Sequence, residues 1–244
     1  MNHDNPDPSR RYTCECKKKL VWEVDDFHAI GCEKTRPIQA SRHKRGVELL
    51  KAAIVKAWGS EAKFPQRREE GANGETGQLK LDNRVKNARG DKIEKYADII
   101  TEIRGNEFWI DVTFVNPGSR DSRSRGSLIR GGRAAEHREH TKKKHYAKCS
   151  GAANVEKHLV PFVIETTGRM GGAATKWIKK WIVAAPSLRI YKPRDPFKPS
   201  TVLYRALGTM CAKAGAQMVM RSREMMVRMG NAAALGGDEV AEGV

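Results

Sequence analysis

The chain has 244 residues, and its 46 Lys and Arg against 29 Asp and Glu give a formal net charge of +17. This excess is unusual for a metabolic enzyme and favours a polyanionic partner, because binding to phosphates releases condensed counterions. The 39% hydrophobic residues suffice for one core of domain size, and no run approaches the 18 apolar residues of a membrane-spanning helix.

The N-terminal segment has neither an apolar stretch typical of a signal peptide nor a regular pattern. Residues 1–11 are polar, contain two prolines and predict a disordered arm. The chain holds five cysteines without a secretory signal. We therefore expect an intracellular, reducing compartment in which thiols bind metals rather than form disulfides.

Soft and borderline metal ligands gather between residues 12 and 35. Four such ligands suit tetrahedral Zn²⁺, although the C-x-C pair is tighter than the usual C-x2-C knuckle. The segment predicts a structural zinc knuckle, with a flexible basic arm of unliganded thiols as the alternative and His43 as a further candidate ligand. The predicted zinc ligands are Cys14, Cys16, His28 and Cys32.

A helix is predicted next, from about residue 38 to residue 58. Its apolar residues Val47, Leu50, Ile54 and Trp58 recur at spacings of three and four, and Gly59 follows. Residues 60–91 contain four glycines and few large apolar residues, so they predict a long loop.

A β-hairpin follows the loop. The runs 96–103 and 107–115 are rich in β-branched and aromatic residues and are separated by Arg104, Gly105 and Asn106. In the second run, the alternation puts an apolar set on one face and leaves Asp111 on the other. That apolar set consists of Phe108, Ile110, Val112 and Phe114.

The remaining segments complete an α/β pattern. We expect a basic loop at 116–130, a helix from 132 to about 149, a strand at 158–167 and a helix at 172–184. The order helix, strand, strand, helix, strand, helix predicts an α/β fold for residues 36–185. A linker at 186–199, a Met-rich helix at 200–230 and a disordered tail at 231–244 follow.

Two aspartates interrupt the apolar pattern of the hairpin. Asp98 and Asp111 lie opposite each other if the loop is the two residues 104 and 105, and diagonally if it has four residues; a three-residue loop separates them. Two like charges on one sheet face repel unless a cation lies between them, and carboxylate oxygens suit Mg²⁺. The alternative is that both aspartates are solvent-exposed.

The order of these motifs resembles the restriction-like endonuclease domain of non-LTR retrotransposons, a branch of the PD-(D/E)XK nuclease superfamily. In that family a Cys/His cluster and an Arg-His pair, here Arg42-His43, precede the nuclease. The resemblance covers most of the chain. The motifs that carry it are Tyr96-Ala97-Asp98-Ile99, Ile110-Asp111-Val112-Thr113, Lys142-Lys143-Lys144-His145-Tyr146 and VPFVIETTGRMG at 160–171.

The resemblance implies a mixed central sheet flanked by helices and a hydrolase that cleaves DNA phosphodiesters with Mg²⁺ or Mn²⁺. It assigns Asp98 and Asp111 to the two acidic positions, whereas Thr113 stands where the superfamily usually has lysine. In the retrotransposon members a lysine of the following helix, four residues before a tyrosine, takes that role. The matching residues are Lys142 and Tyr146, which share one helix face.

Other residues enter this assignment as alternatives or accessories. Lys143 or Lys144 can replace Lys142 in a shifted register, and the whole lysine run is otherwise a solvated phosphate-binding face. Glu48 is a candidate for a further acidic residue near the metal, and Glu165 lies inside a strand.

The resemblance also implies partners and a location. A nuclease of this kind nicks target DNA in the nucleus to prime reverse transcription, so we expect DNA, element RNA and a reverse transcriptase in cis or in trans, and no membrane. Residues 120–148 carry ten Lys and Arg and three Asp and Glu and predict the DNA track. The DNA-binding candidates are Arg120, Arg123, Arg125, Arg130, Arg133, Lys143 and Lys144.

Two further functions stay open at this point. A catalytically dead nucleic-acid-binding protein derived from such an element is favoured by the missing lysine at position 113, and a repair or junction-resolving nuclease belongs to the same superfamily. Polymerase activity is excluded: Tyr96-Ala97-Asp98 imitates a Tyr-x-Asp-Asp box, but Ile99 replaces its second aspartate.

Overall fold

The computed structural model describes residues 11–13, 16, 19–21, 28–64, 97–127, 129–150, 152–185, 196 and 198–235. The chain divides into two compact units, one comprising Arg42–Ala212 and the other the segments Met1–Ser41 and Lys213–Val244. Within the described ranges, every helix is too short or too polar to cross a membrane.

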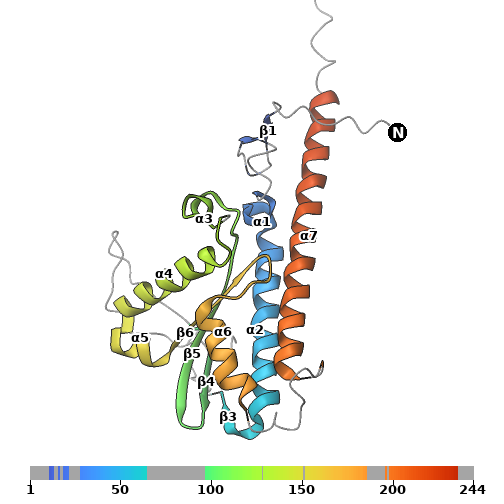
Figure 1. Cartoon of the computed structure of the whole chain (residues 1–244). Helices are drawn as coiled ribbons and strands as arrows, with labels where there is room; N and C mark the ends of the chain where they lie inside the picture. Colours follow the sequence, from blue (N-terminus) through green and yellow to red (C-terminus); the bar gives the residue numbers. More distant parts are fainter. Residues whose placement is uncertain are drawn as a thin grey trace, which may run out of the picture. The chain divides into compact units, whose positions relative to one another are not determined.

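A four-stranded mixed sheet forms the centre of the 42–212 unit (Figure 1). In sheet order the strands are β3 (Ala62–Lys63), β4 (Ile99–Ile103), β5 (Asn106–Val115) and β6 (Leu159–Glu165). The first three are antiparallel, and β6 runs parallel to β5. A parallel pair needs a long crossover. Here it contains α3 (Arg120–Ser124), α4 (Arg133–Ser150) and α5 (Ala152–His158).

The hairpin between β4 and β5 closes with a two-residue loop. Ile103 pairs with Asn106, and both loop residues have positive φ, 50° at Arg104 and 75° at Gly105. Positive φ at both central positions is typical of the hairpin turn that matches the twist of the strands. Ile99 therefore pairs with Ile110. Of the three predicted loop lengths, the structure has the one that places Asp98 and Asp111 opposite each other in register.

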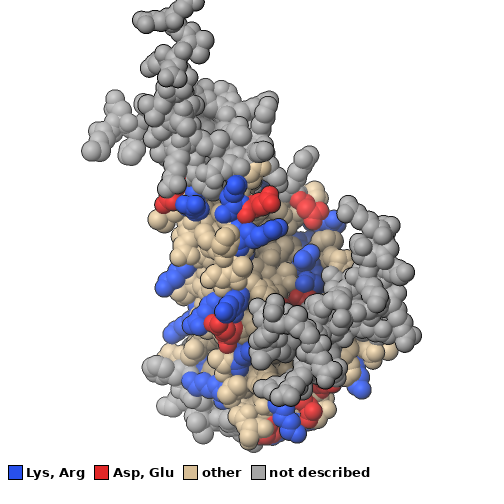
Figure 2. Space-filling model, turned by 180° about the vertical axis from the view of Figure 1, so that it is seen from behind, with Lys and Arg blue, Asp and Glu red and all other residues tan. Residues whose placement is uncertain are grey.

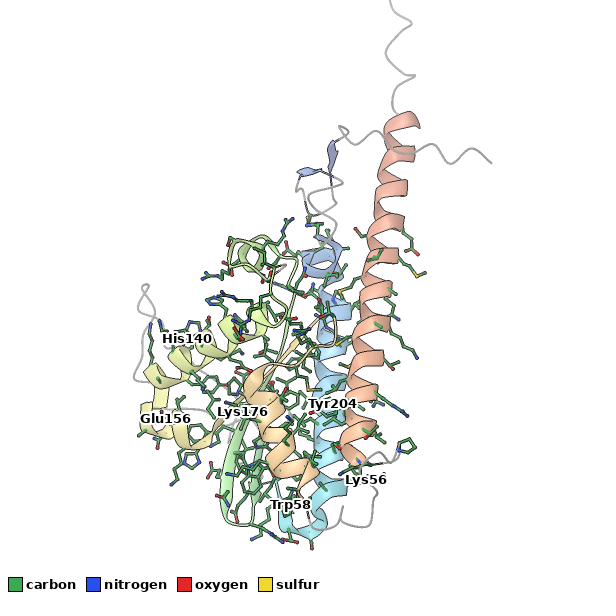
Figure 3. All side chains as sticks on the ribbon, viewed as in Figure 1. Lys56, Trp58, His140, Glu156, Lys176 and Tyr204 are labelled. Atoms are coloured by element: carbon green, nitrogen blue, oxygen red, sulfur yellow. The ribbon has the colours of Figure 1, made fainter. Side chains whose placement is uncertain are left out.

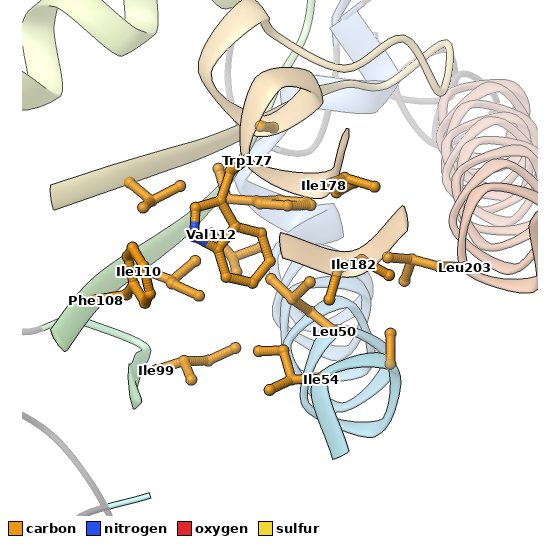
Figure 4. Packing of buried hydrophobic residues seen from close by; sticks show 14 of the residues in the cluster. Leu50, Ile54, Ile99, Phe108, Ile110, Val112, Trp177, Ile178, Ile182 and Leu203 are labelled. Carbon is orange, nitrogen blue, oxygen red and sulfur yellow. The ribbon is translucent and has the colours of Figure 1, made fainter. Parts of the chain in front are cut away.

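One face of the sheet packs against α2 (Arg36–Trp58), α6 (Gly172–Trp177) and the π-helical segment η3 (Ile178–Val183). Figure 4 shows the β5 side chains of Phe108, Ile110 and Val112 among the side chains of these helices. The predicted stripe of α2 is confirmed, because Leu50, Ile54 and Trp58 are buried in this core, and Gly59 follows with a φ of 52°.

The opposite face carries a smaller apolar cluster under α4 and α5. Trp109 of β5 and Tyr146 of α4 are buried there, which confirms that successive β5 residues serve two different cores. The predicted α/β class is thus confirmed as a four-stranded mixed sheet with helices on both faces.

Several predicted boundaries are wrong. The basic segment 116–130 contains helix α3, whose N-cap Ser119 accepts a hydrogen bond from the Ser122 backbone N–H. The predicted loop at 60–91 starts instead with the η2 turn (Gly59–Glu61) and β3. Residues 65–91 lie outside the described residues. Most of the predicted linker at 186–199 also lies outside them.

The C-terminal helix α7 spans Pro199–Leu235, so residues 231–235 of the predicted tail are helical. Its first half is not a separate appendage, because Leu203, Leu207 and Cys211 are buried in the main core.

The other unit begins with a short hairpin. Strand β1 (Arg11–Thr13) pairs antiparallel with β2 (Lys19–Val21), and α1 (His28–Gly31) and η1 (Glu33–Thr35) follow. Arg11 thus belongs to a strand rather than to the predicted arm, whose residues 1–10 lie outside the described residues.

We predict that Leu207→Ala lowers the free energy of unfolding by about 2–5 kcal/mol, since it leaves a cavity in the main core. Val202→Ala on the same helix, where the side chain is 43% exposed, is the matched control and should change stability by less than about 1 kcal/mol. Urea denaturation followed by circular dichroism measures both. Equal effects would mean that the first half of α7 does not stabilise the core.

Candidate active site and metal centre

The candidate active site lies where β5 continues beyond the start of β4. Because β4 begins at Ile99, opposite Ile110, no β4 residue pairs with the later part of β5. Side chains bind the backbone groups there instead: the Val112 N–H donates to Asp98 Oδ2 at 2.7 Å, and the Val112 carbonyl oxygen lies 3.0 Å from His43 Nε2. Buried backbone groups need such partners. Asp98 is thereby held at Val112, the residue that follows Asp111 in β5.

His43 links α2 to this edge of the sheet. Its Nε2 atom lies 3.3 Å from Asp98 Oδ2 in addition to its contact with the Val112 carbonyl. The hydrogen bond to Asp98 raises the pKa of His43, burial opposes this rise, and the negative charges of Asp98 and Asp111 add to it. The sequence named His43 as an alternative zinc ligand, whereas its contacts assign it to the acidic site.

Arg42, the other member of the Arg-His pair, turns to the core. Its side chain is buried, and the guanidinium lies 4.8 Å from the centre of the Phe114 ring. Burial lowers the pKa of this guanidinium. The two neighbouring residues therefore serve different surfaces of α2, one the core and one the site.

Asp111 is a buried carboxylate with cationic and hydroxyl partners. Its residue is 4% exposed, and each of its two oxygens accepts a hydrogen bond from Lys142 Nζ at 2.8 Å. The Thr113 hydroxyl donates to Oδ1 at 3.3 Å. A buried charge needs such pairing. The alternative that Asp111 is solvent-exposed is therefore wrong.

Helix α4 turns one stripe of residues toward the sheet. Ala135, Glu139, Lys142 and Tyr146 follow one another at spacings of four, three and four, which puts them on one helix face. Lys142 is largely covered, with a side chain 19% exposed, and Tyr146 is 1% exposed. The i, i+4 expectation for this pair is met, and the buried Tyr146 ring packs in the cluster that contains Trp109.

Two further carboxylates hold α4 in place. Glu165 Oε1 accepts from the Ala135 backbone N–H at 3.4 Å, and Glu139 Oε1 accepts from the Ala173 N–H of α6 at 2.9 Å. Burial raises the pKa of Glu139. A Cβ atom on Gly171 would lie 2.1 Å from Glu139 Oε1, so glycine is required for this approach. These contacts orient the helix that carries Lys142.

Glu48 lies on the exposed side of α2, where its carboxylate pairs with Arg45 Nη1 at 3.1 Å. It follows His43 by five positions, and this rotates its side chain by about 140° around the helix from that of His43. The residue that α2 directs to Asp98 is thus His43, which charge and spacing in the sequence did not distinguish.

The predicted DNA-binding residues are distributed over α3, α4 and the turn between them. Arg125 pairs with Asp121 at 3.1 Å and Arg130 with Glu136 at 3.2 Å, while Arg133 is exposed. Arg123 is half-buried, and the side chain of Arg120 lies outside the description.

Lys143 and Lys144 are exposed on α4, which is marked in Figure 3 by the exposed His140. The face in Figure 2 carries basic side chains at several places, interspersed with acidic ones, rather than in one patch. Within the lysine run, Lys142 therefore differs from its two neighbours in both burial and partner.

A Cys/His group in the other unit is arranged to hold a metal ion. Ligand atoms of Cys16, His28 and Cys32 all lie within 4.8 Å of one another, and Cys16 Sγ is 3.3 Å from His28 Nε2. It is the single group of three such residues within the described ranges. Cys14, the fourth predicted ligand, lies outside the described residues.

Local hydrogen bonds fix the position of Cys32. Its carbonyl oxygen accepts from the Thr35 N–H at 3.1 Å, the Thr35 hydroxyl at 2.8 Å and Gln39 Nε2 at 3.0 Å. Thr35 is itself buried. The start of α2 therefore holds one ligand of the group rigidly.

Comparison with known proteins does not assign a family, because no family model matches the chain and no curated protein is significantly similar to it. The geometry of the two clusters therefore carries the functional argument.

We predict that Asp98→Asn lowers the pKa of His43, because the hydrogen bond and the charge that raise it are lost. In the native protein the pair with Asp98 stabilises the fold fully below pH 6.5, and this contribution is lost as the pH rises through the raised folded-state pKa of His43. A histidine NMR titration measures the pKa, with His43→Gln identifying the signal. An unchanged pKa in Asp98→Asn would contradict the assignment.

Proposed function

We propose that this chain is a metal-dependent DNA endonuclease with a PD-(D/E)XK-type site, similar to the target-nicking nuclease of non-LTR retrotransposons. The observation that supports it best is the contact of Lys142 with both oxygens of the buried Asp111, at 2.8 Å each. A lysine from the helix after the second acidic strand is the variation that the resemblance implies. The proposal extends to a nuclear location and to element RNA and a reverse transcriptase as partners.

The residues beside the start of β4 fit a hard divalent cation. Asp98 and Asp111 supply carboxylate oxygens. The Val112 carbonyl oxygen is a further oxygen near Asp98, since both lie close to His43 Nε2. Oxygen donors of this kind are the ligands that Mg²⁺ and Mn²⁺ prefer. Bound to these residues, the cation would polarise a phosphodiester and lower the pKa of a water molecule.

The chain's own groups would then position the substrate and balance charge. Lys142 is an ammonium group held at Asp111, next to the place where a phosphate would meet the carboxylates, so it can stabilise charge that develops on the phosphate. Thr113, in the usual lysine position, is too short for this task and instead orients Asp111 by its hydroxyl. His43 holds Asp98 against the end of β5.

The charge of the surrounding segment suits a DNA backbone. Residues 120–148 have a net charge of +7, and exposed Lys143 and Lys144 flank Lys142 on α4. Lysine and arginine side chains near a site of this kind neutralise phosphates without reading sequence. The same electrostatics would serve a repair or junction-resolving nuclease, so the substrate class is DNA in either case.

One observation favours a second function, DNA binding without cleavage. Both carboxylates already have nitrogen partners, Lys142 at Asp111 and His43 at Asp98. A protein in which these pairs persist would neutralise its own acidic site and retain the basic surface. Activity measurements separate the two functions.

We predict that Lys142→Ala lowers the rate of Mg²⁺-dependent plasmid nicking at saturating DNA by on the order of 10²-fold or more, because a preorganised charge is lost. Asp98→Asn and Asp111→Asn should abolish nicking while DNA binding persists. Lys143→Ala is the matched control and should weaken binding modestly, with a salt slope reduced by about one phosphate.

Each variant is first checked for its melting temperature, because Asp111→Asn leaves Lys142 without its carboxylate. Equal, binding-only effects of the Lys142 and Lys143 substitutions would remove Lys142 from the site. A native protein that binds DNA but does not nick it with Mg²⁺ or Mn²⁺ would favour the second function.

We also propose that Cys16, His28 and Cys32 bind a structural Zn²⁺, with Cys14 as the fourth ligand. Two thiolates and an imidazole are a donor set typical of structural zinc. Because the three ligands come from separate short elements, a metal would join the β1–β2 hairpin region to α1 and the start of α2.

We predict about one zinc per chain in purified protein, and its loss in Cys16→Ser/Cys32→Ser. Cys211→Ser is the matched control, since Cys211 is buried in the core of the other unit and should leave the zinc content unchanged. Mass spectrometry of the native protein measures the stoichiometry. Stoichiometric zinc in the double variant would contradict the ligand assignment.

A further inference from the structure

A solvent-exposed isoleucine lies in the basic turn between α3 and α4. Ile129 is 93% exposed, the highest value among the large hydrophobic side chains of the described residues. Single exposed apolar residues are common on protein surfaces. Ile129 differs from these because it lies in a hydrogen-bonded turn whose charged residues are mostly arginines.

Hydrogen bonds hold the turn that carries Ile129. The Gly126 carbonyl oxygen accepts from the backbone N–H groups of Ile129 and Arg130, at 3.1 Å each, and the Gly126 N–H donates to the Arg123 carbonyl at 2.9 Å. Gly126 has a φ of 77°, which glycine adopts without strain. Ser127 is buried beside the exposed Ile129, and its hydroxyl donates to the Pro117 carbonyl oxygen. The turn is therefore anchored, and it directs the isoleucine into solvent.

The charged residues around Ile129 are mostly cationic. Segment 118–133 contains five arginines and one aspartate. From the turn after β6, Arg169 lies so close to Gly131 that a Cβ atom there would be 2.5 Å from its Nη1. An apolar pocket on a protein partner has no charge that matches these arginines. Nucleic acid offers both phosphates and the apolar faces of its stacked bases. Charge complementarity thus favours nucleic acid as the occupant.

The turn is connected to both elements of the candidate site. It joins the end of β5, which carries Asp111, to α4, which carries Lys142. Asp111 lies four residues before the end of β5, a distance of about 13 Å along the strand. The acidic site and the turn with Ile129 are therefore carried by one continuous stretch of chain.

We propose that Ile129 is a wedge that inserts between neighbouring base pairs of duplex DNA, while the arginines around it contact the phosphates. Apolar side chains used in this way unstack a base step and kink the duplex. The inference rests on the proposed function for its ligand, DNA, but not on cleavage. It assigns to the chain a means of distorting DNA at the turn between α3 and α4.

The test uses an A/T-rich duplex in which several adenines are replaced by 2-aminopurine, whose fluorescence rises on unstacking, without added Mg²⁺. The native protein should raise the fluorescence. Ile129→Ala should abolish most of this rise and weaken binding by about tenfold with an unchanged salt slope, since an apolar base contact is lost while the phosphate contacts remain. Ile129→Leu should retain the signal.

Two control substitutions separate apolar from ionic effects. Val55→Ala on α2, where the side chain is 51% exposed, should change neither fluorescence nor affinity. Arg133→Ala should reduce the salt slope and leave the fluorescence of the saturated complex high.

The outcomes distinguish the wedge from the nuclease. If Ile129→Ala unstacks the duplex as the native protein does, the wedge is wrong and the nuclease proposal stands. Unstacking by a protein that does not nick DNA supports the wedge and overturns the nuclease. A native protein that binds anionic phosphatidylserine vesicles but no DNA overturns both.

Discussion

The extra length of β5 relative to β4 is the constraint on which the candidate site depends. Past Ile110 the edge of β5 on this side has no β4 partner, and unpaired backbone groups inside a protein are costly. Asp98 and His43 satisfy the two backbone groups of Val112. A carboxylate and an imidazole are thus held in place by the need of the backbone for hydrogen bonds, and the second aspartate, Asp111, is the β5 residue just before Val112.

The pairing of Asp111 with Lys142 determines how α4 is placed on the sheet. A carboxylate with 4% exposure is stable at this position because an ammonium group and a hydroxyl meet it. Glu165 and Glu139 add hydrogen bonds at the first turns of α4 and α6. These polar contacts lie on the same face of α4 as Tyr146, which is buried in an apolar cluster. Together they determine which face of α4 is turned toward the sheet.

The two paired aspartates connect structure and chemistry in the proposed nuclease. Lys142 and His43 hold the carboxylates in position while the protein is without DNA, and a divalent cation would have to share the same oxygens with them. The basic crossover between β5 and β6 would bring the phosphates to this place. Folding and proposed catalysis thus use one set of charges, which explains why so few residues carry the site.

The sequence by itself determined most of the helices and strands of the main unit and the two faces of β5, because periodicity and turn residues act over a few positions. It left three loop lengths open for the hairpin, and the structure has the two-residue loop. The sequence also singled out Asp98 and Asp111 by charge within apolar strands, whereas Lys142 was named only through the resemblance to the retrotransposon nucleases. Only the tertiary structure decided that His43 meets Asp98, that Glu48 turns to Arg45, and that the first half of α7 completes the core. These contacts join residues far apart in the chain or depend on the rotation of a helix, and no local pattern encodes either.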